Sequence, residues 1–170
     1  MPEDKRSYSS VWSDEAVGTG HARSVINSPQ AWSAKTNQAG EWIQLDLGAE
    51  KTVVGTVIQP RGEDYQYVTS YTVSYSLDGN SWSEAPGTYD GHGTDIKEHI
   101  FSGGKSVRAR YVRVIVKTWS GHISLRADVL IAEDDPNGIL MALSGMSCIP
   151  CRMCTRGLRQ RQQQDSLLRA

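Results

Sequence analysis

The sequence predicts an all-β fold, arranged as an antiparallel sandwich or barrel. Several short runs alternate apolar and polar residues or are rich in β-branched residues, as half-buried strands do. Glycine-containing turn signals separate these runs, and no window of about 12 residues carries a helical apolar period. Many short strands joined by such turns are typical of sandwiches and barrels.

The strands can be placed in order along the chain. The run 42–47 alternates, with Ile43, Leu45 and Leu47 on one face. Comparable alternating or β-branched runs follow at residues 52–58, 71–75, 111–116 and 125–131. Turn signals between the runs lie at residues 47–48, 78–80, 86–87, 91–93, 103–104 and 120–121.

The composition changes after Ala132. Residues 133–138 read Glu-Asp-Asp-Pro-Asn-Gly, which is typical of a linker, and residues 156–169 are rich in Arg and Gln. Such a segment buries too little apolar surface to offset its ordering entropy. We therefore predict a folded domain over residues 7–132, and a linker with a disordered C-terminal tail over residues 133–170.

The charge balance and the N-terminus restrict the class of protein. The 18 Lys and Arg against 19 Asp and Glu give a net charge of −1, whereas a nucleic-acid partner requires a basic face. No apolar run approaches the roughly 18 residues of a membrane span. The charged start Met-Pro-Glu-Asp-Lys-Arg precedes no apolar stretch, so no secretory signal is predicted. A cytoplasmic location, non-classical secretion and a fragment of a larger protein stay open.

All three cysteines lie in the predicted tail, at Cys148, Cys151 and Cys154. The first 147 residues therefore form no internal disulfide, and the domain must rest on packing. The tail has no histidine to complete a tetrahedral zinc site, which favours free thiols. Intermolecular disulfides through these cysteines, giving an oligomer, and reversible lipidation are the alternatives.

The sequence contains no recognisable catalytic motif. It lacks a nucleophile elbow, a phosphate loop, a dinucleotide fingerprint and a paired-histidine zinc motif. The four histidines, His21, His92, His99 and His122, show no metal-ligand spacing, so we interpret them as surface residues. The sequence therefore favours a binding module that is not an enzyme and carries no cofactor.

Ordered sequence blocks across residues 7–132 resemble the discoidin family, also called the factor V/VIII type C domain. The blocks lie at residues 31–34, 41–48, 57–62, 68–76, 78–82, 109–114 and 118–126. The Arg61-Gly62-Glu63-Asp64 loop and the block 119–126 are especially similar to the N-terminal domain of the slime-mould discoidins. The resemblance implies an eight-strand jelly-roll β-sandwich, which agrees with the strand pattern.

The resemblance also implies a function at the loops of one end of the sandwich. Members of the family bind galactose-type sugars, anionic phospholipid membranes or protein partners. We expect non-catalytic recognition of a galactose-type glycan on a cell surface or in the extracellular matrix, in cell adhesion. Anionic phospholipid binding, and a targeting module detached from a larger protein, are the alternatives.

Block order places the ligand-facing loops at residues 11–22, 34–41, 59–67 and 85–99. These loops combine aromatic faces with hydrogen-bonding groups, which suits a hydroxyl-rich sugar. Two carboxylates and no lysine beside Trp12 suit an anionic bilayer poorly. A partly buried strand end is the alternative interpretation of Trp12. The predicted ligand-binding residues are Trp12, Asp14, Glu15, Arg61, Glu63, Asp64, Tyr65, Tyr67 and His92.

The chain departs from the family in its calcium ligands and in how its two ends are joined. Sugar-binding relatives often hold calcium beside the first loop through an Asp-Gly pair, but this chain has Asn27-Ser28-Pro29 there. We therefore predict no metal site, with at most weak Ca²⁺ binding through Asn27 and backbone carbonyls. No cysteine lies near Ser7 or Ala132, so strand pairing alone must join the two ends.

The remaining tryptophans and the strand arginines are predicted to belong to the scaffold. Trp32, Trp42, Trp82 and Trp119 are expected in the core or at its rim. Arg110, Arg113 and Arg126 are expected to form ion pairs, Arg126 with Asp128 or Glu41.

Overall fold

The protein is described by a computed structural model covering residues 1–62, 65–91 and 95–132. Within these residues the fold is all-β and antiparallel, as predicted, with short 3-10 turns at Glu3–Lys5, Trp12–Asp14 and Ser102–Gly104. The strands are β1 (Arg6–Tyr8), β2 (Trp32–Ser33), β3 (Trp42–Gln59), β4 (Tyr67–Ser76), β5 (Ser83–Glu84), β6 (Tyr89–Asp90), β7 (Lys97–Ile100), β8 (Val107–Ser120) and β9 (Ser124–Ile131). The predicted linker and tail, with Cys148, Cys151 and Cys154, lie outside the described residues.

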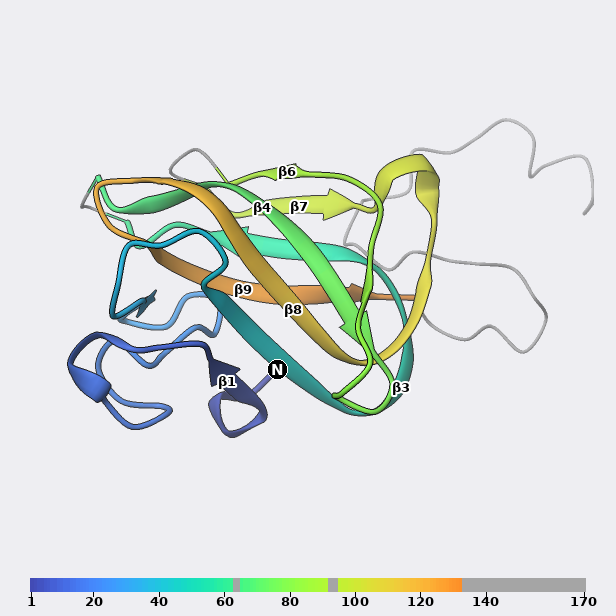
Figure 1. The fold of residues 1–170 in the computed structure, drawn as a ribbon, viewed down its shortest axis with the longest axis horizontal. Coiled ribbons are helices and arrows are strands. Elements are labelled where there is room, and N and C mark those ends of the chain that lie inside the picture. The colour runs from blue at the N-terminus through green and yellow to red at the C-terminus, as the bar shows by residue number, and fades with distance from the viewer. Residues whose placement is uncertain (63–64, 92–94, 133–170) are drawn as a thin grey trace, which may run out of the picture.

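The strands form a curled sandwich around the long strand β3 (Figure 1). The main path of hydrogen-bonded neighbours is β2-β9-β3-β8-β4-β5, with β1 and β7 on β3 and β6 on β4. The first half of β3 pairs with β1 and β8, and its second half pairs with β7 and β9. Strand β3 therefore belongs to both layers. In Figure 1, β4 and β8 of one layer cross in front of β9 of the other.

A bulge inside β3 makes this sharing possible. Gly48 has a φ of +77°, and its N–H donates to Asp46 Oδ1 at 2.9 Å. The register with β8 shifts between Asp46 and Lys51, so the strand bends and continues. The prediction of two strands separated by a turn at Gly48 was wrong, because glycine in this conformation marks a bulge as readily as a turn.

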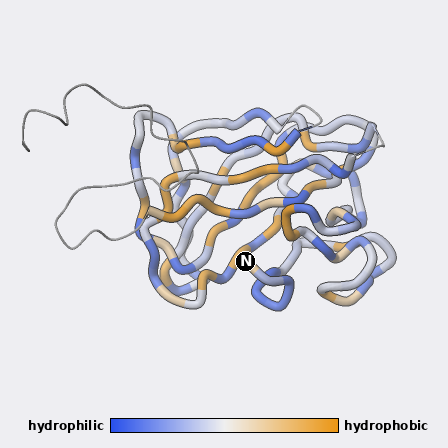
Figure 2. Tube along the Cα trace, turned by 180° about the vertical axis from the view of Figure 1, so that it is seen from behind, coloured by the Kyte–Doolittle hydropathy of each residue, from blue (hydrophilic) through white to orange (hydrophobic). Residues whose placement is uncertain are grey.

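The core lies between the two layers and is lined by alternating residues of the long strands. Ile43, Leu45 and Val114 are fully buried, as the alternation of residues 42–47 predicts. Trp32 is also fully buried, stacks on Tyr8 at 5.8 Å, and donates its indole N–H to the Ser10 carbonyl at 2.8 Å. Figure 2 shows apolar stretches along the strands and mostly polar or neutral loops at one end. The core is therefore mainly apolar, and the loops at this end are mainly polar or neutral.

A cation-π stack covers the outside of the sheet. The Arg113 guanidinium lies 4.2 Å from the Trp42 ring centroid and 3.9 Å from that of Trp82. Its Nε donates to Gln44 Oε1 at 2.9 Å, so the predicted ion pair of Arg113 is replaced by aromatic faces and an amide. The predicted ion pair of Arg110 is present, with Asp46 Oδ1 at 3.1 Å.

The buried Arg6 joins the two ends of the domain. Its side chain is inaccessible to solvent and contacts Asp128 Oδ2 at 3.1 Å. It also donates to the backbone carbonyls of Ser24 and Ala127. We predicted that strand pairing alone joins the two ends. The structure adds a second link, because the Arg6 guanidinium of β1 bonds to Ala127 and Asp128 of β9.

Candidate functional site

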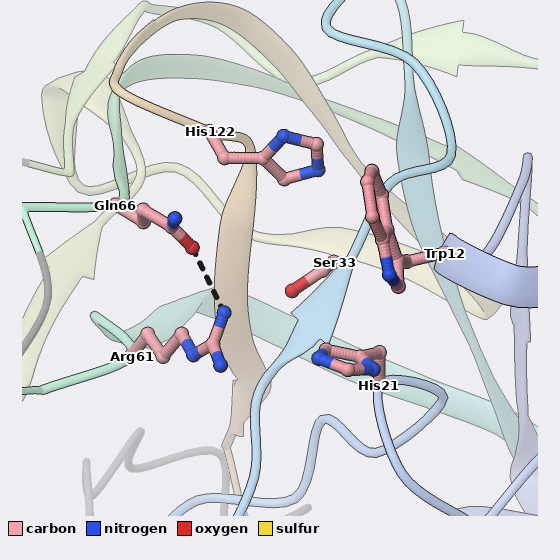
Figure 3. Close-up of a pocket in the computed structure, with 6 residues that line it drawn as sticks. All are labelled: Trp12, His21, Ser33, Arg61, Gln66 and His122. Atoms are coloured by element: carbon pink, nitrogen blue, oxygen red, sulfur yellow. Dashed lines mark hydrogen bonds between the residues drawn. The ribbon is translucent and has the colours of Figure 1, made fainter.

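A cavity of about 230 Å³ opens among the loops at one end of the sandwich (Figure 3). Segments far apart in the sequence meet here: the first loop, β2, the β3–β4 loop and the turn between β8 and β9. Its described lining residues are Trp12, His21, Ser33, Arg61, Gln66 and His122. The lining thus combines one large aromatic ring with polar groups, and none of these six residues is a carboxylate.

Backbone geometry presents Trp12 at the mouth of this cavity. Ser13 and Asp14 have positive φ values of 58° and 52°, so the chain turns sharply after the tryptophan. Trp12 is 48% exposed, and its ring meets the His122 ring edge-on at 5.4 Å. The ring is therefore held by one neighbour and is still accessible to a ligand.

Both cavity histidines have one ring nitrogen committed to an acceptor. His122 Nε2 lies 2.8 Å from the Ala34 carbonyl, which only accepts, so Nε2 carries a hydrogen. His21 Nδ1 lies 3.0 Å from Glu15 Oε2 and likewise donates. In its neutral form each imidazole therefore keeps its other nitrogen, Nδ1 of His122 and Nε2 of His21, as an acceptor.

Glu15 orients His21 from behind. Its carboxylate accepts from the backbone N–H and the ring of His21, and the backbone bond chiefly lowers the pKa of Glu15 below its ordinary value. A Cβ at Gly20, which has a φ of +37°, would collide with this carboxylate. Glycine at this position thus lets the loop close around Glu15.

Arg61 and Gln66 form the opposite wall (Figure 3). Arg61 Nη1 donates to Gln66 Oε1 at 2.8 Å, which turns the amide nitrogen of Gln66 away from this bond. Both residues come from the loop between β3 and β4. This wall therefore supplies mainly donors, and the two histidines supply acceptors.

Arg126 lies behind this wall and is 7% exposed. Its Nε lies 3.0 Å from the Ser28 carbonyl and 3.3 Å from that of Gln30, and Nη1 lies 2.6 Å from that of Pro60. Nη2 lies 3.3 Å from the Arg61 carbonyl. The expected pairing with Asp128 or Glu41 was wrong, because Asp128 holds Arg6 and the N-terminal amine, and Glu41 accepts from Ser10 and Thr36.

The structure brings only some of the predicted site residues together. Trp12 and Arg61 line the cavity. Asp14 pairs with Lys35 at 2.6 Å, and Glu15 acts only through His21. Tyr65 is 87% exposed beside Gln66, and Tyr67 lies half-buried at the start of β4. Glu63, Asp64 and His92 lie outside the described residues.

Sequence reasoning missed His21, Ser33, Gln66 and His122. His21 and His122 were interpreted as surface residues because each is a lone histidine in a loop. The six-residue step from Glu15 to His21 within a glycine-rich loop is the one sequence signal that pointed to a pair. Nothing local indicates that Trp12 and His122 meet, because only the closed sandwich brings them together.

The described residues do not fit the calcium site that the resemblance implies. Asn27 Oδ1 accepts from Gln59 Nε2 at 3.0 Å, and the Ser28 carbonyl accepts from Arg126. In the described part of the chain no group of three or more His, Cys, Asp or Glu is arranged to hold a metal ion. Its helices also include none long and apolar enough to cross a membrane.

A second hollow, of about 320 Å³, lies in the predicted loop 34–41 and is lined by Ser9, Gln38, Ala39, Gly40 and Glu41. Glu41 accepts from hydroxyls of Ser10 and Thr36, and the hollow offers no aromatic face. The cavity beside Trp12 is therefore the better candidate site.

A rigid antiparallel sandwich that carries a polar and aromatic pocket on its end loops has the architecture of a binding module. The chain belongs to the F5/8 type C domain family, whose profile matches residues 6–129.

Curated relatives share part of their length with this chain. Lactadherin of Rattus norvegicus is 40% identical over 109 residues, covering 59% of this chain and 25% of lactadherin. A discoidin-1 polypeptide of Dictyostelium discoideum is 32% identical over 110 residues, covering 61% of this chain and 42% of the relative. The chain thus spans less than half the length of these relatives.

Solved structures share the fold. Discoidin II of Dictyostelium discoideum superposes with a TM-score of 0.58 at 21% identity, covering 74% of this chain and 53% of its own. A family 32 carbohydrate-binding module of Clostridium perfringens, solved with GalNAc-β-1,3-galactose, superposes with a TM-score of 0.59 at 22% identity, covering 74% and 93%. Both comparisons agree with the predicted sandwich.

Proposed function

We propose that this domain is a non-catalytic carbohydrate-recognition module that binds a galactose-type saccharide in the cavity beside Trp12. The observation that carries the proposal is a half-exposed indole ring at the mouth of a small polar cavity. The cavity of about 230 Å³ is smaller than the roughly 300–1,000 Å³ of pockets for drug-sized ligands, which favours a single sugar unit.

The chemistry of the lining supports a sugar. An aromatic face packs against the C–H face of a pyranose, and sugar hydroxyls both donate and accept hydrogen bonds. Trp12 supplies the face, Arg61 and Gln66 supply donors, and the neutral histidines supply acceptors. The site thus presents complementary groups for several hydroxyls at once.

The comparisons support the same class of ligand. The Clostridium perfringens module was solved with GalNAc-β-1,3-galactose, and a second one, from NanJ, with galactose. These proteins share the fold with our chain at low identity, so the ligand class rests on the site chemistry as well. By the same reasoning we propose that the domain acts at a cell surface or in the extracellular matrix, in adhesion.

A shallow site of this kind binds weakly by itself, so useful avidity needs several copies. Cross-linking through Cys148, Cys151 and Cys154, which lie outside the described residues, is our hypothesis for assembling them. Oxidised protein on a non-reducing gel tests it, and migration as monomer alone would contradict it.

A fluorescence titration tests the sugar site. Galactose and N-acetylgalactosamine are added to the whole chain, and we expect a saturable change in tryptophan emission. Trp12→Ala should weaken binding at least about tenfold, since a stacked aromatic contributes about 1 kcal/mol beyond its buried area. Calorimetry should give the same affinities.

Two variants sharpen this test. Trp12→Phe keeps an aromatic face and should retain most of the affinity, whereas Leu77→Ala should change nothing. Leu77 is a matched control because it is 54% exposed, apolar and directly beyond the far end of β4. Equal binding by Trp12→Ala and the parent protein would exclude this site.

Binding to anionic phospholipid is the second candidate, favoured by the exposed apolar residues Trp12, Val17 and Tyr65 on these loops. Asp14 and Glu15 on the first loop oppose an anionic surface. Sedimentation with phosphatidylserine vesicles distinguishes the two functions: binding to vesicles without any response to sugars would replace our proposal with this one.

A further inference from the structure

The most unusual charge near the candidate site belongs to Arg126, which does not line the cavity. It is 7% exposed and has no carboxylate partner among the described residues, because its hydrogen bonds go to four backbone carbonyls. Burial, and then the nearby Arg61 charge, lower the pKa of Arg126 below its ordinary value. An isolated buried charge is costly, so these carbonyl dipoles must compensate it.

The four carbonyls come from two separate loops. Ser28 and Gln30 precede β2, which carries Ser33 into the cavity, whereas Pro60 and Arg61 begin the loop that carries Arg61 and Gln66. The planar fork of Arg126 bridges both loops from the adjacent strand β9. The relative position of two cavity walls thus depends on one guanidinium.

Backbone carbonyl oxygens gathered from two loops are also the ligands that a calcium ion would take. Here the Ser28 carbonyl is bonded to Arg126, and the amide oxygen of neighbouring Asn27 is bonded to Gln59. A divalent cation beside the buried guanidinium would meet both electrostatic repulsion and occupied oxygens. The Arg126 guanidinium, a part of the chain itself, already supplies the positive charge that a metal ion would bring to this loop.

We propose that Arg126 is a positioning residue that acts as an internal cation, tying the loop before β2 to the loop after β3, so that saccharide binding depends on Arg126 and needs no calcium. This inference rests on the proposed sugar site. Its loop-ordering part is independent of any ligand, and the experiment measures the two parts separately.

The test uses the whole chain with GalNAc-β-1,3-galactose as the probe. The affinity of the parent protein should be the same within about twofold in excess EDTA and in about 5 mM CaCl₂, above the weakest protein calcium sites. Arg126→Lys keeps the charge but loses the fork, and should weaken binding about tenfold, as expected when two charge-assisted hydrogen bonds are lost. Arg110→Lys is the control, because Arg110 of β8 pairs with Asp46 of β3 and neither residue lines the cavity.

Chemical rescue distinguishes positioning from general destabilisation. In Arg126→Ala, amide hydrogen exchange should accelerate at residues 27–31 and 61–62. Added guanidinium at millimolar concentration, far below the denaturing range, should slow this exchange and restore the affinity for the saccharide. Potassium at the same concentration should not. If Arg126→Ala fails to fold, exchange in Arg126→Lys carries the test.

The outcomes separate the two proposals. Loss of parent binding in EDTA, or unchanged affinity in Arg126→Lys, would overturn the role of Arg126. No binding by the parent protein would overturn the sugar site, and the exchange and rescue data would still decide whether Arg126 ties the loops. Unchanged exchange in both Arg126 variants would refute the positioning role by itself.

Discussion

At the scale of single residues, the two cavity histidines have fixed and opposite tautomers. His122 donates from Nε2 to the Ala34 carbonyl, and His21 donates from Nδ1 to Glu15. Each neutral ring therefore presents its other nitrogen as an acceptor. A saccharide hydroxyl in the cavity would donate to these two nitrogens.

We accordingly expect removal of both acceptors to weaken the affinity for a neutral galactoside by about tenfold, as the loss of one or two hydrogen bonds would do. The double variant His21→Phe/His122→Phe keeps two aromatic rings but removes their nitrogens, and calorimetry measures its Kd. His99→Phe, at a residue that does not line the cavity, should leave the Kd unchanged. An unchanged Kd in the double variant would contradict this role of the histidines.

At the same scale, only part of the candidate site could be predicted from the sequence. Trp12 and Arg61 were predicted because their residue types and block positions are informative without a partner. His122 was not predicted, because its contact with Trp12 spans 110 residues of the sequence. Gln66 was not predicted either, because its place in the site depends on a side-chain amide that bonds to Arg61. Arg126 was misassigned because a buried arginine satisfied by carbonyls has the same sequence pattern as one in an ion pair.

At the scale of elements, the turn after β4 is organised by one carboxylate. Asp78 Oδ1 accepts from the backbone N–H groups of Asn80 and Ser81, both at 2.8 Å, and from Ser76 Oγ at 2.9 Å. These bonds lower the pKa of Asp78 from 3.8 to about 2. Because the folded-state pKa is below the unfolded one, this stabilisation is present above about pH 4 and is lost as the pH falls through about 2.

Asp78→Asn should therefore destabilise the domain modestly at neutral pH and hardly at all near pH 2. Urea unfolding of the parent protein and the variant at several pH values measures this difference. Glu84→Gln, an exposed carboxylate on the adjacent β5, is the control and should show no such convergence. A difference that stays constant with pH would show that the Asp78 charge does not organise the turn.

The strand pattern was more predictable than the strand boundaries. The alternation at residues 42–47 was correct because it reflects the two faces of a sheet with one buried side. The alternation at residues 71–75 holds only as far as Val73, because Ser74 is buried as well. The continuity of β3 through Gly48 was not predictable, because it depends on pairing with β8 and β9, which follow much later in the chain.

At the scale of the whole molecule, Arg6 holds together segments from both ends of the domain. It contacts the Met1 carbonyl, Ser24 and the backbone of β9, and its side chain is inaccessible to solvent. Burial lowers the pKa of Arg6 below its ordinary value, partly offset by the Asp128 charge. This arrangement replaces the covalent closure that a disulfide would give.

Arg6→Lys should cost about 2–4 kcal/mol of unfolding free energy, because a buried charge and several carbonyls lose their partners. Thermal and urea unfolding check this. The exposed Arg108, which pairs with Glu50 at 2.7 Å, is the control, and Arg108→Lys should cost under about 0.5 kcal/mol. Similar costs for both variants would show that Arg6 does not join the ends.

The sharing of β3 between the two layers also governs how the domain folds. Val53 pairs with Ile131 and Trp32 pairs with Leu125, so the layer that contains β2 and the second half of β3 depends on β9. Such distant pairings fold slowly, on the scale of about milliseconds to seconds, because long loops must close first. During synthesis, the layer of β2, β7 and β9 is incomplete until β9 leaves the ribosome, and the cavity, whose lining includes Ser33 of β2 and His122 beside β9, is assembled only then.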